Sequence, residues 1–396
     1  MALLARPWLL RLAGSAAAAA LAPREAPAQS CDFAPITQIV DDLLAANPQI
    51  PGVALRLAKG EHVLYERYFG TYSPLTVVPI ASASKLLSAA TVMTLVDAGT
   101  LDLDAPVSAR LPAFTGAKGE MTLRQMFSHT SGLPGGTDPP VLADKTITLA
   151  QAVDEIACCI PLAAPPGTQF AYGGLSMQVG GRVAEVADGQ LWDALFAHRL
   201  AGPLGMTHTD YDGFGATDNP RIAGGARSSL DDYGRLLEML LAKGSFRGAR
   251  ILSEAAVAEM WQDQTFGVPI VFAPVGLAGL RYGLGAWRNL VTAQGEPLRV
   301  SSPGAFGFTP WLDLDLGFYG IFLVTTNYQT LLDEMAQIQT LAHAEIAACA
   351  PTPQVAATST AGRLALALAL AATCAAASAA ARRRARTEQV NKGTLV

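Results

Sequence analysis

The feature that most constrains this chain is an apolar stretch with one lysine inside it. The stretch PIASASKLLSAATVMTLVDAG covers residues 79–99, and Lys85 is its only charge before Asp97. Its length and composition predict a helix over residues 83–96, with Ser82 as a favourable residue at its N-terminal cap. Almost every position is apolar or small, which is typical of a helix buried on all sides. Such a helix requires a sizeable folded domain around it.

Lys85 has two interpretations. Burying an ammonium group in apolar surroundings is costly unless the group is paired or gives up its proton. In the simpler interpretation, the side chain reaches solvent from an ordinary core helix. In the other, Ser82 lies one turn away on the same face, and desolvation makes Lys85 a base for a serine nucleophile.

The overall composition restricts the function classes. The chain has 396 residues, a net charge of −5 and 51% hydrophobic residues, enough for one large domain or two small ones. This mild negative charge gives no reason to expect a nucleic-acid partner. The chain contains neither C-x-x-C nor H-E-x-x-H, so we expect no metal site and no cofactor.

The N-terminal residues 1–28 are expected to be a secretory signal peptide. Arg6 and Arg11 flank the start of an apolar, alanine-rich run, and Ala26-Pro27-Ala28 matches an A-x-A cleavage site. An organelle transit peptide is the alternative, because no acidic residue precedes Glu25. The expected location is therefore the secretory pathway or another extracytoplasmic compartment.

The C-terminal end suggests a membrane anchor. Residues 364–381 carry no charge and are followed at once by an arginine-rich segment, 382–396. This pattern predicts a transmembrane helix with a basic cytoplasmic tail, preceded by a linker over 350–363. An alanine-rich, low-complexity tail is the alternative.

Residues 29–349 are expected to form one catalytic-sized domain. Strand patterns near its start, joined at Lys59-Gly60, and near its end surround a loop-rich helical region, which suggests one sheet built from both termini. Helices are predicted over residues 35–47, 123–127, 150–156 and 176–187, with a closing helix over 331–348.

The cysteines leave several possibilities open. Cys31 and Cys349 lie at the two edges of the expected domain, and a disulfide between them would tie its ends together. Cys158 and Cys159 are adjacent, and the sequence does not show whether they are bonded, free or simply packed.

Three segments contain candidate chemistry. The S-x-x-K pattern occurs once, at Ser82 and Lys85, whereas the G-x-S-x-G pattern of other serine hydrolases is absent. No histidine has an obvious acidic partner nearby, so the lysine is the better candidate base. Tyr172, in PPGTQFAYGG, lies in a glycine-rich loop before a helix, where packing is the simpler explanation. In SSPGAFG, at 301–307, small residues follow an expected edge strand and would let a substrate approach the backbone, although a bulge or tight turn is the simpler explanation.

Together these segments resemble the serine beta-lactamase and penicillin-recognising family, most closely its class C, family VIII esterase and D-aminopeptidase branch. Ser82 and Lys85 match its first motif, and Tyr172 matches its second, within a P-G-x-x-F-x-Y pattern. Ser302-Pro303-Gly304 aligns with the third motif, and FSHTSGLP at 127–134 looks like the H-T-S-G-L signature. The resemblance implies an α+β, beta-lactamase/transpeptidase-like fold, with an antiparallel sheet flanked by helices and a helical subdomain.

The resemblance also implies roles for individual residues. Ser82 would be the nucleophile, and Lys85 with Tyr172 would move its proton. The backbone N–H groups of Ser82 and Ala305 would form the oxyanion hole. The substrate-binding side would include Ser302, Gly304 and Gly174.

Two positions depart from the family pattern. Gly174 stands where an asparagine would bind the substrate amide and the lysine, and Ser302 stands where a lysine or histidine would attract a substrate carboxylate. Both changes disfavour an efficient beta-lactamase or carboxypeptidase and are compatible with ester hydrolysis. The triplet Thr217-Asp218-Asn219 imitates an S-D-N motif, but its distance from Ser82 along the chain is wrong for that role.

The sequence therefore predicts a serine hydrolase that forms an acyl-enzyme on a small-molecule or peptide substrate. Esters are favoured over amides, including beta-lactams and D-amino-acid peptides. The alternative is a binding or scaffolding protein that keeps the penicillin-recognising fold with weak or no turnover.

Overall fold

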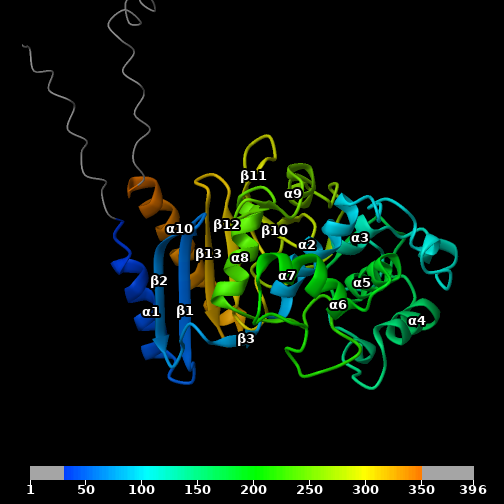
Figure 1. The fold of residues 1–396 in the computed structure, drawn as a ribbon, viewed down its shortest axis with the longest axis horizontal. Coiled ribbons are helices and arrows are strands. Elements are labelled where there is room, and N and C mark those ends of the chain that lie inside the picture. Colours follow the sequence, from blue (N-terminus) through cyan, green and yellow to red (C-terminus); the bar gives the residue numbers. More distant parts are fainter. Residues whose placement is uncertain (1–30, 350–396) are drawn as a thin grey trace, which may run out of the picture. The chain divides into compact units, whose positions relative to one another are not determined.

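The computed structural model describes residues 31–349, and its centre is a seven-stranded antiparallel sheet (Figure 1). The strand order places the N-terminal hairpin beside the C-terminal strand, so the predicted sheet from both ends of the domain is confirmed. Gly60, with φ of 58°, makes the predicted turn of that hairpin. The order is β2 (His62–Gly70), β1 (Gly52–Lys59), β13 (Phe318–Val324), β12 (Thr309–Asp313), β11 (Pro297–Ser301), β10 (Trp287–Val291) and β9 (Arg281–Tyr282).

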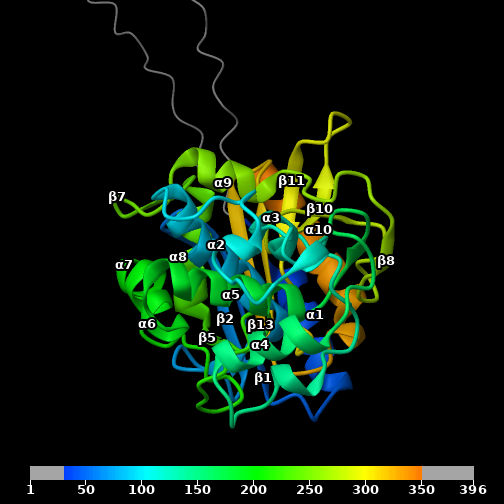
Figure 2. The same ribbon diagram turned by 90° about the vertical axis from the view of Figure 1, so that its right-hand side faces the viewer.

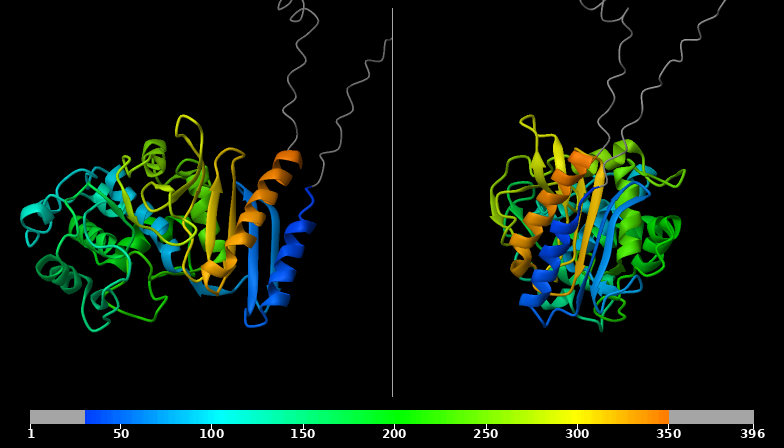
Figure 3. Two further views of the ribbon diagram at one scale, coloured as in Figure 1. Left: turned by 180° about the vertical axis from the view of Figure 1, so that it is seen from behind. Right: turned by 90° about the vertical axis from the view of Figure 1, so that its left-hand side faces the viewer.

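The sheet is covered on both faces because its central strands are apolar on both sides. Along β1, Val53, Leu55 and Leu57 pack with α1 (Ala34–Ala46) and α10 (Leu332–Cys349), which lie together on one face (Figure 3). The alternate residues Ala54 and Ala58 belong to the core on the other face. The period of two along the strand thus separates two hydrophobic cores.

The larger core contains the helical part of the molecule, which extends away from the sheet (Figures 1 and 2). Short strand pairs link it to the sheet side: β3 (Val77–Pro79) with β5 (Arg227–Ser229), and β4 (Phe170–Ala171) with β8 (Ile270–Phe272). A small hairpin joins β6 (Ser245–Phe246) and β7 (Ala249–Arg250). The helices are α2 (Ser84–Asp97), α3 (Leu123–Phe127), α4 (Leu149–Cys159), α5 (Leu175–Asp188), α6 (Trp192–Phe196), α7 (Gly202–Leu204), α8 (Leu230–Leu241) and α9 (Glu254–Trp261).

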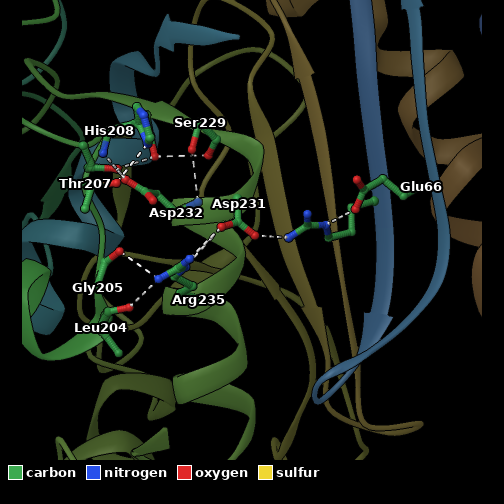
Figure 4. A network of polar contacts seen from close by, with 12 residues as sticks. Glu66, Leu204, Gly205, Thr207, His208, Ser229, Asp231, Asp232 and Arg235 are labelled. Atoms are coloured by element: carbon green, nitrogen blue, oxygen red, sulfur yellow. Dashed lines mark hydrogen bonds and ion pairs between the residues drawn. The ribbon is translucent and has the colours of Figure 1, made fainter. Parts of the chain in front are cut away.

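Helix α8 is tied to the sheet by the polar network shown in Figure 4. Arg56 of β1 donates to Glu66 at 2.6 Å and to Asp231 at 3.2 Å, and Arg235 donates to the same Asp231 at 2.9 Å. Ser229 caps the helix by accepting the N–H of Asp232 at 3.1 Å. The ion pair between Arg56 of β1 and Asp231 of α8 joins two elements that are far apart in sequence, and it holds α8 against β1.

Two sequence-based expectations need correction. The helix after Pro79 begins at Ser84, and Ser82 lies in a preceding 3₁₀ turn, Ala81–Ala83, where its side chain caps nothing. The strand before Ser302 is not an edge strand, because β10 and β9 continue the sheet beyond β11. The expected helix boundaries elsewhere agree with the structure to within a few residues.

Several expectations concern residues outside the described part. The signal peptide (1–28), the linker (350–363), the transmembrane segment (364–381) and the basic tail (382–396) lie there entirely. Within residues 31–349, no helix has the length and apolar character needed to cross a membrane, and no cluster of side chains suits a metal ion.

The bonding of two pairs of cysteines could not be decided from the sequence. Cys158 and Cys159 form a disulfide with each other. Cys31 and Cys349 are also disulfide-bonded cysteines, and their pairing with each other stays a prediction.

Candidate active site

Ser82 lies in a turn that three hydrogen bonds hold in place. The Ser84 hydroxyl donates to the carbonyl of Ala81 at 2.6 Å and accepts the N–H of Ala226 at 3.0 Å. The buried Tyr233 of α8 donates to the carbonyl of Ala83 at 2.8 Å. Ala81 has a φ of 44°, a conformation that a non-glycine residue adopts only when its surroundings impose it. The half-buried Ser82 side chain is therefore presented from a fixed backbone.

Lys85 points at Ser82 from inside the helix. Its side chain is 4% exposed, and its Nζ lies 3.1 Å from Ser82 Oγ and 2.9 Å from the carbonyl oxygen of Ala223. The same Nζ lies 4.5 Å from the centre of the Tyr172 ring. Among the described residues, no carboxylate forms an ion pair with it. The structure thus brings the three predicted catalytic side chains together.

Tyr172 follows β4 and is fixed on both sides of its backbone. Its N–H donates to the carbonyl of Phe272 at 3.1 Å, and its carbonyl accepts the N–H of Gly136 at 2.9 Å. Its ring packs against His129, with centroids 4.6 Å apart, and against Trp287 at 5.2 Å. These contacts position the ring, while its hydroxyl makes no hydrogen bond to another residue of 31–349.

His129 is an unusual neighbour of Tyr172. It is buried, has a φ of 60°, and neither ring nitrogen has a hydrogen-bond partner within the described chain. Burial, with the nearby charge of Lys85, holds the pKa of His129 well below its ordinary value. The imidazole is therefore neutral at physiological pH and packs as an aromatic ring between Tyr172 and Tyr282.

The segment after β11 lies directly against the serine turn. Ser302 is buried, and its hydroxyl is 3.2 Å from the carbonyl oxygen of Ser82 and 3.1 Å from that of Gly285. A Cβ added at Gly304 would lie 2.1 Å from the carbonyl oxygen of Ile80, so only glycine fits there. Ala305 is exposed, and its N–H donates to no group of residues 31–349. Ser302 and Gly304 thus hold the segment that precedes Ala305 against the serine turn.

Comparison with known proteins identifies the family. The sequence matches the family described as Beta-lactamase over residues 36–344, most of the chain. The chain belongs to the beta-lactamase family. A putative beta-lactamase from Bacteroides dorei DSM 17855 is 35% identical, with a TM-score of 0.70 over 78% of this chain and 99% of that one.

Two further similarities are more distant or cover only part of the chain. Penicillin-binding protein 4 of Amycolatopsis lactamdurans is 33% identical over 184 residues, which cover 42% of this chain and 46% of that protein. The chain therefore aligns with less than half the length of that curated relative. EstCE1, described as a hydrolase with promiscuous acyltransferase activity, shares the fold at 22% identity, with a TM-score of 0.65 over 78% of this chain and 98% of its own.

These matches confirm the expected fold and define the activity broadly. The antiparallel sheet with flanking helices is the beta-lactamase/transpeptidase-like α+β fold. The protein is a beta-lactamase-family serine hydrolase.

The position of the missing asparagine, Gly174, is filled by another side chain. A Cβ added at Gly174 would lie 2.7 Å from Oδ1 and 3.0 Å from Oδ2 of Asp138, and 2.8 Å from Leu142. Asp138 accepts the N–H of Gly174 at 2.9 Å and the Nη2–H of Arg221 at 2.8 Å. In this beta-lactamase-family protein, an asparagine at position 174 would therefore have to displace the Asp138 carboxylate.

Three residues near the site were not predicted from the sequence: His129, Asp138 and Arg221. His129 could have been predicted to lie near the site, because it belongs to the FSHTSGLP segment that matches a family signature. Asp138 and Arg221 lie in loops with no family motif, so nothing in the sequence pairs them. Asn219 of the S-D-N look-alike is buried and binds Gln178 at 2.8 Å and the carbonyl of Val141 at 2.9 Å, a structural role.

Proposed function

We propose that this protein hydrolyses esters through an acyl-enzyme on Ser82. The observation that supports this most directly is the 3.1 Å contact between Nζ of the buried Lys85 in α2 and Oγ of Ser82 in the turn before it. A hydroxyl held against an amine in a desolvated site can lose its proton as it attacks a carbonyl. Membership of the beta-lactamase family makes an acylated serine the natural intermediate.

The proposed reaction has two stages. Ser82 Oγ attacks the ester carbonyl while its proton passes to Lys85 in the neutral amine form, and Lys85 or Tyr172 returns that proton to the departing alkoxide. Water then attacks the acyl-serine bond, which releases the carboxylic acid and restores the hydroxyl. In each stage the N–H groups of Ser82 and Ala305 would stabilise the negative oxygen of the tetrahedral intermediate.

The recognition side favours an ester over an amide or a beta-lactam. Gly174 has no side chain to bind a substrate amide, and the buried Ser302 offers no positive charge to the carboxylate of a beta-lactam or peptide. An alcohol is a better leaving group than an amine, so an ester depends less on these contacts.

The test is covalent labelling followed by a substrate panel. The full chain and Ser82→Ala are treated with a fluorophosphonate probe and a fluorescent penicillin, with Ser73→Ala as an exposed-serine control. We expect labelling of the wild type and of Ser73→Ala but not of Ser82→Ala. Absence of labelling by both probes would favour the alternative, a binding or scaffolding protein with the same fold.

The panel then assigns the substrate class. It contains short 4-nitrophenyl esters, a chromogenic cephalosporin and D-alanyl peptides. We expect the esters to be hydrolysed fastest. Turnover of the cephalosporin without ester hydrolysis would overturn the proposed preference.

A further inference from the structure

A cavity of about 190 Å³ lies next to the site and is lined by none of the predicted site residues. Its lining combines apolar and cationic side chains, mainly Leu142, Lys145, Tyr211, Phe214, Asn219 and Arg221. Two of these residues are basic and none of the residues lining the cavity is acidic. The cavity therefore suits an anionic group attached to a short apolar chain.

Three contacts connect this cavity to the active site. Arg221 stands two residues before Ala223, whose carbonyl oxygen lies 2.9 Å from Lys85 Nζ. The Phe214 ring packs on Phe306, the residue after Ala305, with centroids 5.9 Å apart. Asp138 binds both Arg221 and the backbone of Gly174. Residues that line the cavity are thus connected to the site through Asp138 and Phe306.

Arg221 is positioned to bind a second carboxylate. Its guanidinium lies over the face of Phe214, 5.2 Å from the ring centre, and 30% of its side chain is exposed. Of the five N–H groups of an arginine, only one bonds to a residue of the described chain, the Nη2–H given to Asp138. The planar guanidinium matches a carboxylate in two-point contact, and Asp138 with Phe214 holds it in place.

The lysine that lines the same cavity is less available. Lys145 is exposed, and its ammonium donates to the carbonyl of Phe214. It therefore adds positive potential near the cavity mouth, whereas Arg221 offers the free donors.

We propose that this cavity binds a free carboxylate on the acyl part of the substrate, with Arg221 as the specificity-determining residue. The preferred substrates would then be monoesters of dicarboxylic acids. This proposal rests on the proposed function for turnover, but the binding of a dicarboxylate does not depend on it. Arg221 would supply, from another segment, the positive charge that Ser302 lacks.

The first experiment compares two esters of equal chain length with the full-length protein. 4-Nitrophenyl hydrogen adipate carries a terminal carboxylate, and 4-nitrophenyl hexanoate carries a methyl group in its place. We expect kcat/KM to be at least about tenfold higher for the adipate ester, as for one hydrogen bond between charged groups. Arg221→Met should remove this ratio, and Arg221→Lys should keep part of it.

Arg227→Gln is the matched control. Arg227 forms a similar ion pair with Asp210, at 2.8 Å, but does not line the cavity. The control should leave the ratio of the two esters unchanged. Equal loss in Arg221→Met and Arg227→Gln would show a general effect of surface charge and would overturn the proposal.

The second experiment separates this proposal from the proposed function. Methyl hydrogen adipate, which keeps one free carboxylate, and methyl hexanoate, which has none, are titrated into Ser82→Ala by calorimetry, where no turnover occurs. We expect the adipate monoester to bind at least about tenfold more tightly than the hexanoate ester, and Arg221→Met to abolish the difference. Binding of the adipate monoester without ester turnover would defeat only the proposed function. Ester turnover with no preference for adipate in either assay would defeat only the carboxylate site.

Discussion

The nucleophile side of the site and its recognition side are constructed differently. Ser82 and Lys85 are three residues apart, at the junction of a 3₁₀ turn and α2, and this local spacing places Nζ within reach of Oγ, at 3.1 Å. On the recognition side, Asp138 reaches Gly174 across 36 residues and Arg221 across 83. One side is set by local spacing, and the other is set by how distant loops pack.

This difference suggests where such a site can change. A substitution on the nucleophile side removes the reacting group itself, because no other segment supplies it. On the recognition side, the asparagine absent at Gly174 is replaced in space by a carboxylate from another loop. Distant loops can therefore exchange polar groups while the serine and lysine stay in place.

The largest expected effect is that of Ser82→Ala. Removing the nucleophile should lower kcat for a 4-nitrophenyl ester by on the order of 10⁴-fold or more. The folded structure should persist, because the Ser82 side chain caps no helix. Steady-state kinetics and a thermal melt measure both effects, and residual activity near the wild-type level would place the nucleophile elsewhere.

Lys85→Met should have the next largest effect. The methionine keeps the length and apolar stem of the side chain but removes the amine that contacts Ser82 Oγ. We expect kcat to fall by about 10²- to 10⁴-fold, the range for loss of a general base. If Tyr172→Phe has the larger effect on the same ester, the phenol rather than the amine is the main base.

Gly174→Asn tests whether an asparagine at position 174 competes for space with the carboxylate of Asp138. The new side chain would collide with the Asp138 carboxylate, at 2.7 Å from its Cβ, and with Leu142. We expect about 1–3 kcal/mol loss in the free energy of unfolding, the usual cost of overpacking. The measurement is chemical denaturation of the full chain.

The double variant Gly174→Asn/Asp138→Ala is the control for this exchange. Removing the carboxylate leaves room for the asparagine, so part of the lost stability should return. Additive losses in the double variant would mean that the two positions do not compete for the same space.

His129 should make stability depend on pH. Its pKa is well below the ordinary 6.5 in the folded state, so the unfolded chain takes up the proton first as the pH falls. The stability is fully present above pH 6.5 and falls below it by up to about 1.4 kcal/mol per pH unit. Denaturation of His129→Phe between pH 7 and 5 should show a flatter slope, whereas the exposed His62→Gln should match the wild type.

The smallest expected effect is that of Ser302→Ala. Its hydroxyl contacts the carbonyls of Ser82 and Gly285, so the change removes about 1 kcal/mol of hydrogen bonding at the serine turn. We expect a loss of less than about tenfold in kcat/KM with little change in substrate preference. A large shift in preference between charged and neutral esters would instead make Ser302 a direct substrate contact.

Much of the fold could be predicted because it depends on short-range patterns. The all-apolar helix, the hairpin at Gly60 and the closing helix are each encoded by periodicity within a segment. The start of α2 was placed one residue early, because a serine before an apolar run usually caps the helix. Here the backbone of the serine turn is held instead by Ser84 and Tyr233, and the latter comes from a distant helix.

By itself, the sequence determined the nucleophile side: a serine and a lysine at helical spacing, in a segment too apolar to lie on a surface. Only the tertiary structure decided the recognition side, where Asp138 occupies the space beside Gly174 and Arg221 faces a cavity. The physical reason is the distance along the chain between the residues that make each contact. Helical spacing fixes a contact between residues three apart, whereas a contact between loops depends on the packing of every element that lies between them.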